Sequence, residues 1–439
     1  MKQRLNIQWY SPFIFLLMAL IPVVAQEKII TERTGGDILF VEAHYVVFSA
    51  ETAEVVIPYR IRNDYFVFSR PLNTIADVYS AKADVIIEVL DSVGNSVARK
   101  IEHLELLSPT NIKAELRKNY TQGLVTFTLS KGAYTILVRV EDNEAKQFSA
   151  DIRKQFIIRN TEPLTRSSFV PVQPLSGATT EWTLCNVGGD VLFSQPFGFL
   201  FTSPTDTLET VHYTIKRRMD EDDEQKIVLD TTVRCVKFSD VMMTIQKKDQ
   251  NIVASIRNKD KQHVYYIPVN GVQLRQGRYE MTIIASNALL GTVQFATRWL
   301  DMPMSLTDLD IAIYPLQYLL TEEEYFSLRK GARESRIQKF EEFWKKKDPT
   351  PETAMNEMMA EFYRRVDYAI NAFRTLKEPN GSLTDRGKIY ILYGKPTSTE
   401  RVLSPNSTPR EIWTYENLKK TFVFEDPSKQ GNYKLVESR

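Results

Sequence analysis

From residue 36 to about residue 160, apolar residues alternate with polar ones in one short segment after another. In the segment AEVVIPYRIRN, the apolar face consists of Val55, Ile57, Tyr59 and Ile61. The residues between them are expected to be more exposed, because a period of two is typical of strands with one buried face. KADVIIEVLD and GLVTFTLSKGAYTILVRVED repeat the pattern, and DSVGNS is a hairpin signal. These features predict an antiparallel sandwich of immunoglobulin-like type.

A second β region is predicted from about Thr179 to Leu300. It follows a connector rich in Pro, Ser and Thr, residues 159–177. Its strand candidates are VHYTIKRR, KIVLDTTVRCVKF, MMTIQKKDQNIVASIRNK, HVYYIPV and GRYEMTIIAS, with KKDQN as a hairpin tip. We expect a second sandwich here.

The two β regions resemble weak copies of each other. KGAYTILVRV around Gly132 matches QGRYEMTIIA around Gly277, and GDILF at Gly36 matches GDVLF at Gly189. Two matches in the same order and at similar offsets favour a tandem repeat over chance.

At about Met302 the period becomes helical. Thr321 and Glu324 form a predicted capping box, and a break is expected near Gly331. Thr350 is expected to cap a further helix, with Pro351 at its first position. The apolar stripe of that helix is Met355, Met359, Phe362, Val366, Ile370 and Phe373.

After Pro379-Asn380-Gly381, strands are expected again in KIYILYG, EIWTYEN, TFVFEDP and YKLVESR. Helices followed by a small antiparallel sheet define an α+β unit. The predicted organisation is a multidomain chain with a signal peptide (1–25), two immunoglobulin-like β-sandwiches (26–163 and 178–300) and an α+β domain (301–439).

The first residues have the pattern of a secretory signal. Lys2 and Arg4 precede the apolar run Phe13–Ile21, and small residues then place a cleavage site after Ala25. A membrane anchor is the alternative, but the run is shorter than the roughly 20 residues a span needs, and Pro22 ends it. We expect an exported protein, periplasmic or extracellular, with no membrane span in the mature chain.

Composition narrows the possible chemistry. The 56 basic and 55 acidic residues argue against a nucleic-acid-binding protein, which usually carries a basic stripe. The four His residues are scattered, so no metal site and no cofactor are expected. Cys185 and Cys235 form either a disulfide, as an exported pair would, or two separate buried thiols.

Several motifs in the last third occur in a characteristic order. They are SLTDLDIAIYPLQYL, FWKKKDP, the helix Asn356 to Phe373, TDRGKIYILYGKP, EIWTYEN, FVFED and GNYKLVES. Together they resemble the bacterial GWxTD domain family over roughly Met302 to Arg439. The naming motif is Gly-Trp-any-Thr-Asp, and here Ser382 stands at the Trp position of Gly381–Asp385. The resemblance implies an upstream β-rich region and a signal peptide, but no shared reaction or cofactor.

The strongest candidate site is the group Thr384, Asp385, Arg386 and Gly387. In a functional interpretation Asp385 is a base and Arg386 binds a carboxylate in bidentate fashion. In a conformational interpretation, which we favour, Thr and Asp bind turn backbone and Gly387 supplies a positive φ before a strand. The charged partners expected for Asp385 or Arg386 are Arg364, Arg365 or Asp367 of the preceding helix.

The other candidate sites are better explained by structural roles or lack the required spacing. The methionines Met355, Met358 and Met359 and the pair Phe343–Trp344 could form ligand surfaces, but their helical spacing favours core packing. The run Asp220–Glu224 lacks the alternating spacing of a calcium loop.

The sequence therefore favours an exported, non-catalytic binding or structural module of the cell envelope. Its expected partner is a protein or a cell-envelope polysaccharide. The alternative is an envelope hydrolase with a site around Asp385 and Arg386. The two hypotheses differ in whether these side chains line an open pocket or bind the surrounding backbone.

Overall fold

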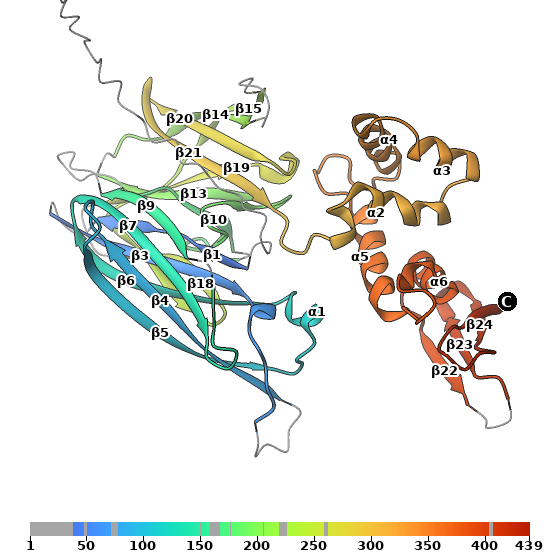
Figure 1. Ribbon diagram of the computed structural model, residues 1–439. Coiled ribbons are helices and arrows are strands. Elements are labelled where there is room, and N and C mark those ends of the chain that lie inside the picture. The colour runs from blue at the N-terminus through green and yellow to red at the C-terminus, as the bar shows by residue number, and fades with distance from the viewer. Residues whose placement is uncertain are drawn as a thin grey trace, which may run out of the picture. The chain divides into compact units, whose positions relative to one another are not determined.

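The computed structural model describes most of the chain from Ile38 onward (Figure 1). The described residues are 38–47, 51–71, 78–149, 151–158, 167–175, 177–204, 206–218, 226–258, 262–403 and 407–439. The predicted signal peptide, Gly36 and the acidic run Asp220–Glu224 lie outside these ranges. The described part is mostly β-sheet, with helices concentrated toward its C-terminal end, so the predicted class is correct at this level.

The first β region contains two antiparallel sheets. Sheet one has the order β5 (Ser96–Ser108), β4 (Tyr79–Leu90), β7 (Gly132–Asp142), and β8 (Gln147–Phe148) and β9 (Ile152–Ile158) both pair with β7. Sheet two consists of β3 (Thr52–Arg62) and three strands that pair with it: β1 (Leu39–Val41), β2 (His44–Val47) and β6 (Tyr120–Ser130). The short helices η1 (Asn63–Tyr65) and α1 (Lys113–Leu116) lie in the connections.

The predicted hairpin turn DSVGNS is confirmed. The side chain of Asp91 accepts hydrogen bonds from the backbone NH groups of Val93 and Asn95, and Gly94 takes φ +92° between β4 and β5. The chain then passes from β6 in sheet two to β7 in sheet one. A core between the two sheets, including Ile57, Val85 and Val138, makes them a sandwich.

The second β region also contains two sheets. It begins before the predicted Thr179, because Val170–Pro174, inside the predicted connector 159–177, is a strand. Sheet three has the order β16 (Val236–Phe238), β19 (His263–Val269), β13 (Phe197–Ser203), β10 (Val170–Pro174), β11 (Glu181–Leu184), β18 (Asn251–Asn258), β17 (Val241–Lys248). Sheet four has the order β12 (Val191–Leu192), β21 (Ala288–Arg298), β20 (Arg278–Ala285), β14 (Thr210–Arg218), β15 (Lys226–Arg234). The short helix η2 (Gly271–Gln273) follows β19.

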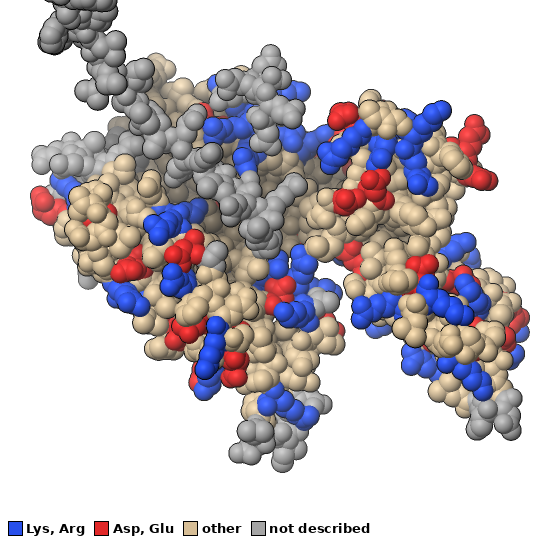
Figure 2. Space-filling model, in the orientation of Figure 1, with Lys and Arg blue, Asp and Glu red and all other residues tan. Residues whose placement is uncertain are grey.

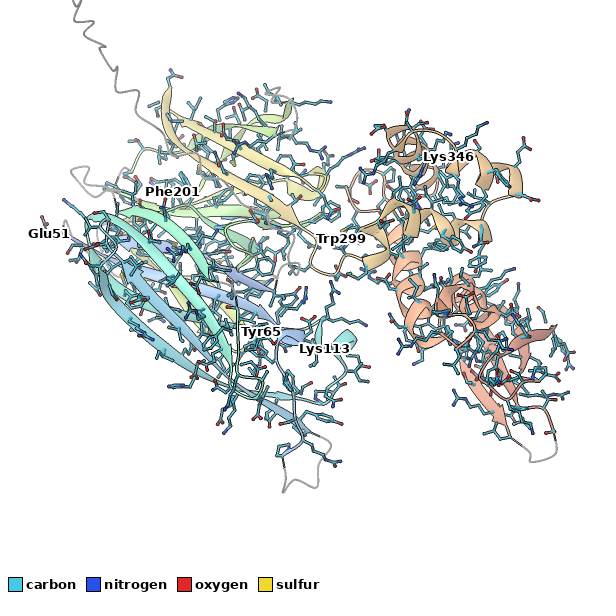
Figure 3. All side chains as sticks on the ribbon, viewed as in Figure 1. Glu51, Tyr65, Lys113, Phe201, Trp299 and Lys346 are labelled. Atoms are coloured by element: carbon cyan, nitrogen blue, oxygen red, sulfur yellow. The ribbon has the colours of Figure 1, made fainter. Side chains whose placement is uncertain are left out.

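The core between sheets three and four is rich in aromatic side chains. Phe201, labelled in Figure 3, is fully buried and stacks on Tyr265 with ring centroids 5.4 Å apart. Phe199 and Met281 belong to the same core. The predicted hairpin tip KKDQN is confirmed between β17 and β18, where Asp249 takes φ +55°.

Sheet two is buried on both of its faces. Val55 and Ile57 of β3 face the core of the first sandwich, but Val56 joins a separate core with Val172 and Leu200 of sheet three. The expectation that the alternate residues of β3 are exposed is therefore wrong. In a strand that is covered on both sides, successive residues are all buried and do not alternate with exposed ones. Here the second face of β3 is covered because sheet two packs on sheet three.

The internal match KGAYTILVRV with QGRYEMTIIA marks equivalent strands. β7 and β20 occupy the same place in sheets of the same order, β5-β4-β7-β9 and β15-β14-β20-β21. The hydroxyl groups of Tyr134 and Tyr279 each donate to the carbonyl oxygen four residues earlier, at 3.0 and 2.7 Å. The second match fails: β1 pairs with β3 in sheet two, whereas β12 lies in sheet four.

The C-terminal part has its own core, made by helices and a four-stranded sheet. The helices are η3 (Met304–Leu306), α2 (Leu309–Ile313), η4 (Tyr314–Tyr318), α3 (Glu322–Arg329), α4 (Arg333–Lys345), α5 (Glu357–Ala372), η5 (Gly381–Leu383), α6 (Asp385–Tyr393) and η6 (Glu416–Leu418). Sheet five has the order β22 (Ser398–Val402), β23 (Arg410–Tyr415), β24 (Lys420–Glu425), β25 (Lys434–Ser438).

The predicted capping box of Thr321 and Glu324 is confirmed at the start of α3, and the break falls at Gly331, which takes φ +112°. The predicted start of the next helix is wrong. Asn356, not Thr350, caps α5: its side-chain oxygen accepts from the backbone NH of Met359 at 2.8 Å. Its amide nitrogen also donates to the carbonyl of Trp344 at 2.8 Å, so the cap ties α5 to the end of α4.

The segment KIYILYG is a helix and not a strand. Ile389 and Ile391 are buried with partly exposed neighbours, which imitates the alternation of a strand. Two signals at its ends indicate the helix instead. Thr384 caps its first turn, and Gly394 takes φ +77° directly after its last residue.

Candidate functional site

The corner around Thr384 depends on two glycines that let backbone segments approach closely. A Cβ atom on Gly381 would lie 2.2 Å from the carbonyl oxygen of Ala369 in α5. A Cβ atom on Gly387 would lie 2.0 Å from the carbonyl oxygen of Gly381. Gly387 lies within α6 and has no positive φ, so its predicted role before a strand is wrong. It is needed because α6 begins directly against η5.

Thr384 is buried, and its hydroxyl group is fully used by the backbone around it. The hydroxyl oxygen accepts from the NH of Gly387 at 3.0 Å and donates to the carbonyl of Gly381 at 2.8 Å. This is the bonding of a helix N-cap, which satisfies one of the free donors of the first turn.

Asp385 is half-buried and binds the edge of sheet five. Its carboxylate accepts from the backbone NH of Leu435 at 2.9 Å. An acid in the first helical turn is also stabilised by the helix dipole. The contact fixes the start of α6 against β25.

Arg386 lies between an acid and two aromatic rings. Its guanidinium donates to Glu411 at 3.2 Å and to the carbonyl of Gly431 at 3.2 Å. It also lies over the rings of Tyr433 and Phe373, 4.4 and 5.5 Å from their centroids. The pairing predicted with charged residues of the preceding helix is wrong, because the partner comes from β23.

Glu411 connects this corner to sheet five. Its side chain is only 4% exposed and accepts from the indole NH of Trp413 at 2.7 Å. Arg401, from β22, lies 3.4 Å from the same carboxylate. Glu411 could not be singled out from sequence, because its two charged partners, Arg386 and Arg401, come from other elements.

The charged residues of α5 that were predicted to pair with Asp385 or Arg386 have other partners. Arg364 binds Asp301 at 2.8 Å, and Arg365 binds Glu361 at 2.7 Å. Asp367 accepts from the backbone NH groups of η3. Thr384, Asp385, Arg386 and Gly387 therefore do come together, but as a structural corner bonded to backbone and to Glu411.

Ser382, at the Trp position of the motif, is buried. Its hydroxyl donates to the side-chain oxygen of Asn380 at 2.6 Å, and its carbonyl accepts from the hydroxyl of Tyr318 at 2.8 Å. Burial raises the pKa of Tyr318 to about 12, so its hydroxyl stays protonated and donates this bond at neutral pH. η4 and η5 are thereby joined beside residue 382.

A second polar group, which we call the Glu42 cluster, was not found from sequence. It consists of Glu42, His44, Arg60, Gln122 and Asn186. The carboxylate of Glu42 contacts the His44 ring at 2.7 Å and accepts from the backbone NH of Val187 at 2.7 Å. Burial alone would raise the pKa of Glu42, but His44 and the backbone donors outweigh it and hold that pKa below its ordinary value.

The remaining members extend the cluster toward sheet two. The Asn186 amide donates to the carbonyl of Tyr59 at 3.1 Å and to the Gln122 oxygen at 2.8 Å. Arg60 donates to the same Gln122 oxygen at 3.2 Å, and burial lowers the pKa of its guanidinium. Because Glu42 is 2% and His44 4% exposed, the cluster is closed to substrates and joins the two β regions.

Cys185 and Cys235 are free thiols in the core between sheets three and four. Burial raises the pKa of Cys235 to about 11 and also raises the pKa of Cys185. Of the two alternatives, the structure therefore has two separate buried thiols, and both stay protonated at neutral pH.

The predicted packing of aromatic residues is confirmed for Trp344, which is buried against Phe362 in the C-terminal core. Met359 packs on the same core, but Met358 is 51% exposed. Within the described ranges, no three His, Cys, Asp or Glu side chains gather as a metal site would require. In those ranges no helix has the length and apolar character needed to span a membrane.

Charge is spread without a dominant sign over the β-rich part of the displayed face (Figure 2). This agrees with the nearly equal counts of basic and acidic residues.

The family model of the GWxTD domain matches residues 291–439, which confirms the resemblance in the C-terminal part of the chain. No curated protein matches the chain.

Among solved structures, the chain is similar to a glycosyl hydrolase family 2 member from Bacteroides cellulosilyticus, at 15% identity and a TM-score of 0.19. That match covers 28% of this chain and 14% of the hydrolase. A match to Bacteroides uniformis beta-glucuronidase 2 covers 13% of the enzyme, so the chain spans a small part of both.

Two further matches are longer. The C-terminal domain of the Streptococcus pyogenes antigen I/II-family protein AspA matches at 9% identity and a TM-score of 0.13, over 59% of this chain and 100% of that one. A two fibronectin type-III domain segment from chicken tenascin matches at 9% identity and a TM-score of 0.14, over 59% and 97%. At TM-scores this low, these likenesses carry no argument about function.

Proposed function

We propose that this protein is an exported, non-catalytic binding or structural module of the cell envelope. In this proposal two immunoglobulin-like sandwiches precede the GWxTD-like α+β domain, and the partner is a protein or a cell-envelope polysaccharide. The observation that carries it is the bonding of the corner around Thr384. Thr384 binds backbone, Asp385 binds the NH of Leu435, and Arg386 binds Glu411.

A general base must be free to reach a proton on its substrate. Asp385 instead accepts from β25, and Arg386 is 12% exposed between two rings. Residues committed to backbone contacts in this way support a structural role and argue against the hydrolase alternative. The packing of sheet two on sheet three further supports a stiff β region as opposed to two loosely linked modules.

Crosslinking in the native cell envelope, followed by mass spectrometry, tests the proposal. We expect one partner protein, or polysaccharide-linked peptides, to recur between independent preparations. Sequencing the N-terminus of the purified mature protein tests export, and we expect it to begin at Gln26. A chain that retains Met1 would contradict export.

A pair of variants separates the two roles of Asp385. Asp385→Ala removes the acceptor for Leu435 and is expected to lower the melting temperature, whereas Asp385→Asn keeps an acceptor oxygen and restores most of it. Both variants are expected to retain the crosslinked partner at a temperature where they are folded. If both lose function with unchanged melting temperatures, Asp385 acts chemically and the hydrolase hypothesis replaces ours.

A further inference from the structure

A pocket of about 260 Å³ lies beside Ser382, at the position where the family motif has Trp. It is formed by α2, η4, α5 and η5, all within the C-terminal part. Its lining includes Ile311, Tyr314, Pro315, Val366 and Ser382.

The walls of this pocket are mainly apolar. Val366 and Pro315 are buried, whereas Ile311 and Tyr314 at the opening are 48% and 38% exposed. The polar groups nearby already have partners: the Asn380 oxygen binds Ser382, and Asp310 pairs with Arg336. An apolar space with a partly open mouth favours an apolar ligand over water.

Ser382 lines this pocket with a small side chain. Its hydroxyl is bonded to Asn380, so it does not extend into the pocket as a large ring would. The neighbouring backbone is held by Tyr318 independently of the side chain at residue 382. The corner therefore keeps its geometry without an indole, and the pocket is open beside residue 382.

We propose that this pocket binds a planar aromatic group the size of an indole ring, supplied by another molecule. A cavity of about 150 Å³ with apolar walls is enough to bind benzene in another protein, so a larger one accommodates a fused ring pair. Tyr314 offers an aromatic wall for offset or edge contacts with the bound ring. The site is assigned from this geometry alone and does not depend on the proposed function.

Isothermal titration calorimetry of the full mature chain with indole tests the site. We expect saturable binding to the natural protein. Ser382→Trp is expected to fill the pocket from within, abolish indole binding and raise the melting temperature. Absence of heat with the natural protein at millimolar indole would overturn the proposal.

Because Ser382→Trp could disturb the corner, a second variant changes a residue at the opening of the pocket. Ile311→Glu places a charge at the mouth, where burial of the ring would desolvate it, and is expected to weaken indole binding by about tenfold or more. Leu376→Glu is the matched control: Leu376 is 93% exposed, does not line the pocket and should leave binding unchanged. Equal affinity in Ile311→Glu and the natural protein would contradict the site.

N-acetyl-tryptophanamide distinguishes the source of the ring. If it binds as well as indole, the pocket accepts a Trp side chain from a polypeptide. If only indole binds, the natural ligand is a free small aromatic molecule. Binding of either probe that Ser382→Trp and Ile311→Glu leave unaffected would place the ligand elsewhere and overturn the proposal.

Discussion

The Glu42 cluster and the corner around Thr384 are both networks of charged and polar side chains, and they differ in how they are assembled. The Glu42 cluster brings together residues from four distant places in the sequence, and its acid is 2% exposed. The corner is built mostly from consecutive residues, and Asp385 is half-buried. Local sequence therefore marks a network only when its members are neighbours in the chain.

The two networks also carry different energetic consequences. A fully buried charge that loses its partner keeps its desolvation penalty, whereas a half-exposed one is partly solvated by water. The cluster should therefore be the more sensitive of the two to substitution.

Glu42→Ala is expected to have the largest effect. It leaves His44 and the NH of Val187 without their acceptor and should lower the free energy of unfolding by about 3–5 kcal/mol, measured by urea denaturation. Glu105→Ala is the control, because Glu105 is an 80% exposed acid on β5 and should change stability by less than about 0.5 kcal/mol. Equal effects would mean that the cluster is not a structural link.

Gly387→Ala tests the close approach in the corner. The new methyl group would meet the carbonyl oxygen of Gly381, a backbone atom that cannot rotate away. We expect a loss of about 1–3 kcal/mol, read as a lower melting temperature in circular dichroism. Lys388→Ala, at the exposed next position, should leave the melting temperature nearly unchanged. Tolerance of Ala at residue 387 would show that η5 and α6 can move apart.

The pH dependence of stability separates the networks further. The pKa of folded Glu42 lies below its ordinary value of 4.5, so the unfolded state binds more protons in that range. The stabilisation is complete above that value and is lost as the pH falls through the folded pKa. Urea midpoints between about pH 6 and pH 3 should fall more steeply for the natural protein than for Glu42→Gln. Parallel curves would contradict a buried carboxylate.

Thr384→Ala should have the smallest effect. It removes the helix cap but leaves the other contacts of the corner, so we expect a loss of about 1 kcal/mol in urea denaturation. Thr384→Ser keeps the hydroxyl and is the matched control, with nearly unchanged stability. If Ala and Ser behave alike, the hydroxyl does not hold the start of α6.

Sequence reasoning was accurate where the signal was local. The capping box at Thr321, the break at Gly331 and the hairpin at Asp91 each depend on a few neighbouring residues, and the structure has all three. The match between KGAYTILVRV and QGRYEMTIIA was also correct. It marks two strands at equivalent places in their sheets, and Tyr134 and Tyr279 make the same hydrogen bond in each.

It failed where two local signals competed. The buried Ile389 and Ile391 give KIYILYG a period of two, which predicts a strand, whereas Thr384 and Gly394 fit the two ends of a helix. The helix forms because the Thr384 cap and Gly394 at its end satisfy backbone groups at its two ends. Its Tyr393 also packs on Phe422 of sheet five. A strand here would have had to replace those bonds.

Local patterns in the sequence are enough to predict the β-rich character of residues 38–300, the helical stripe of α5 and the GWxTD-like order of motifs. Only the tertiary structure decided that Val56 and Arg60 are buried, that both thiols are free, and that Arg386 pairs with Glu411. The physical reason is that the period of apolar residues shows only which residues of a segment lie on the same face. Which segment covers the second face, and which charge completes a pair, depends on residues far away in the chain.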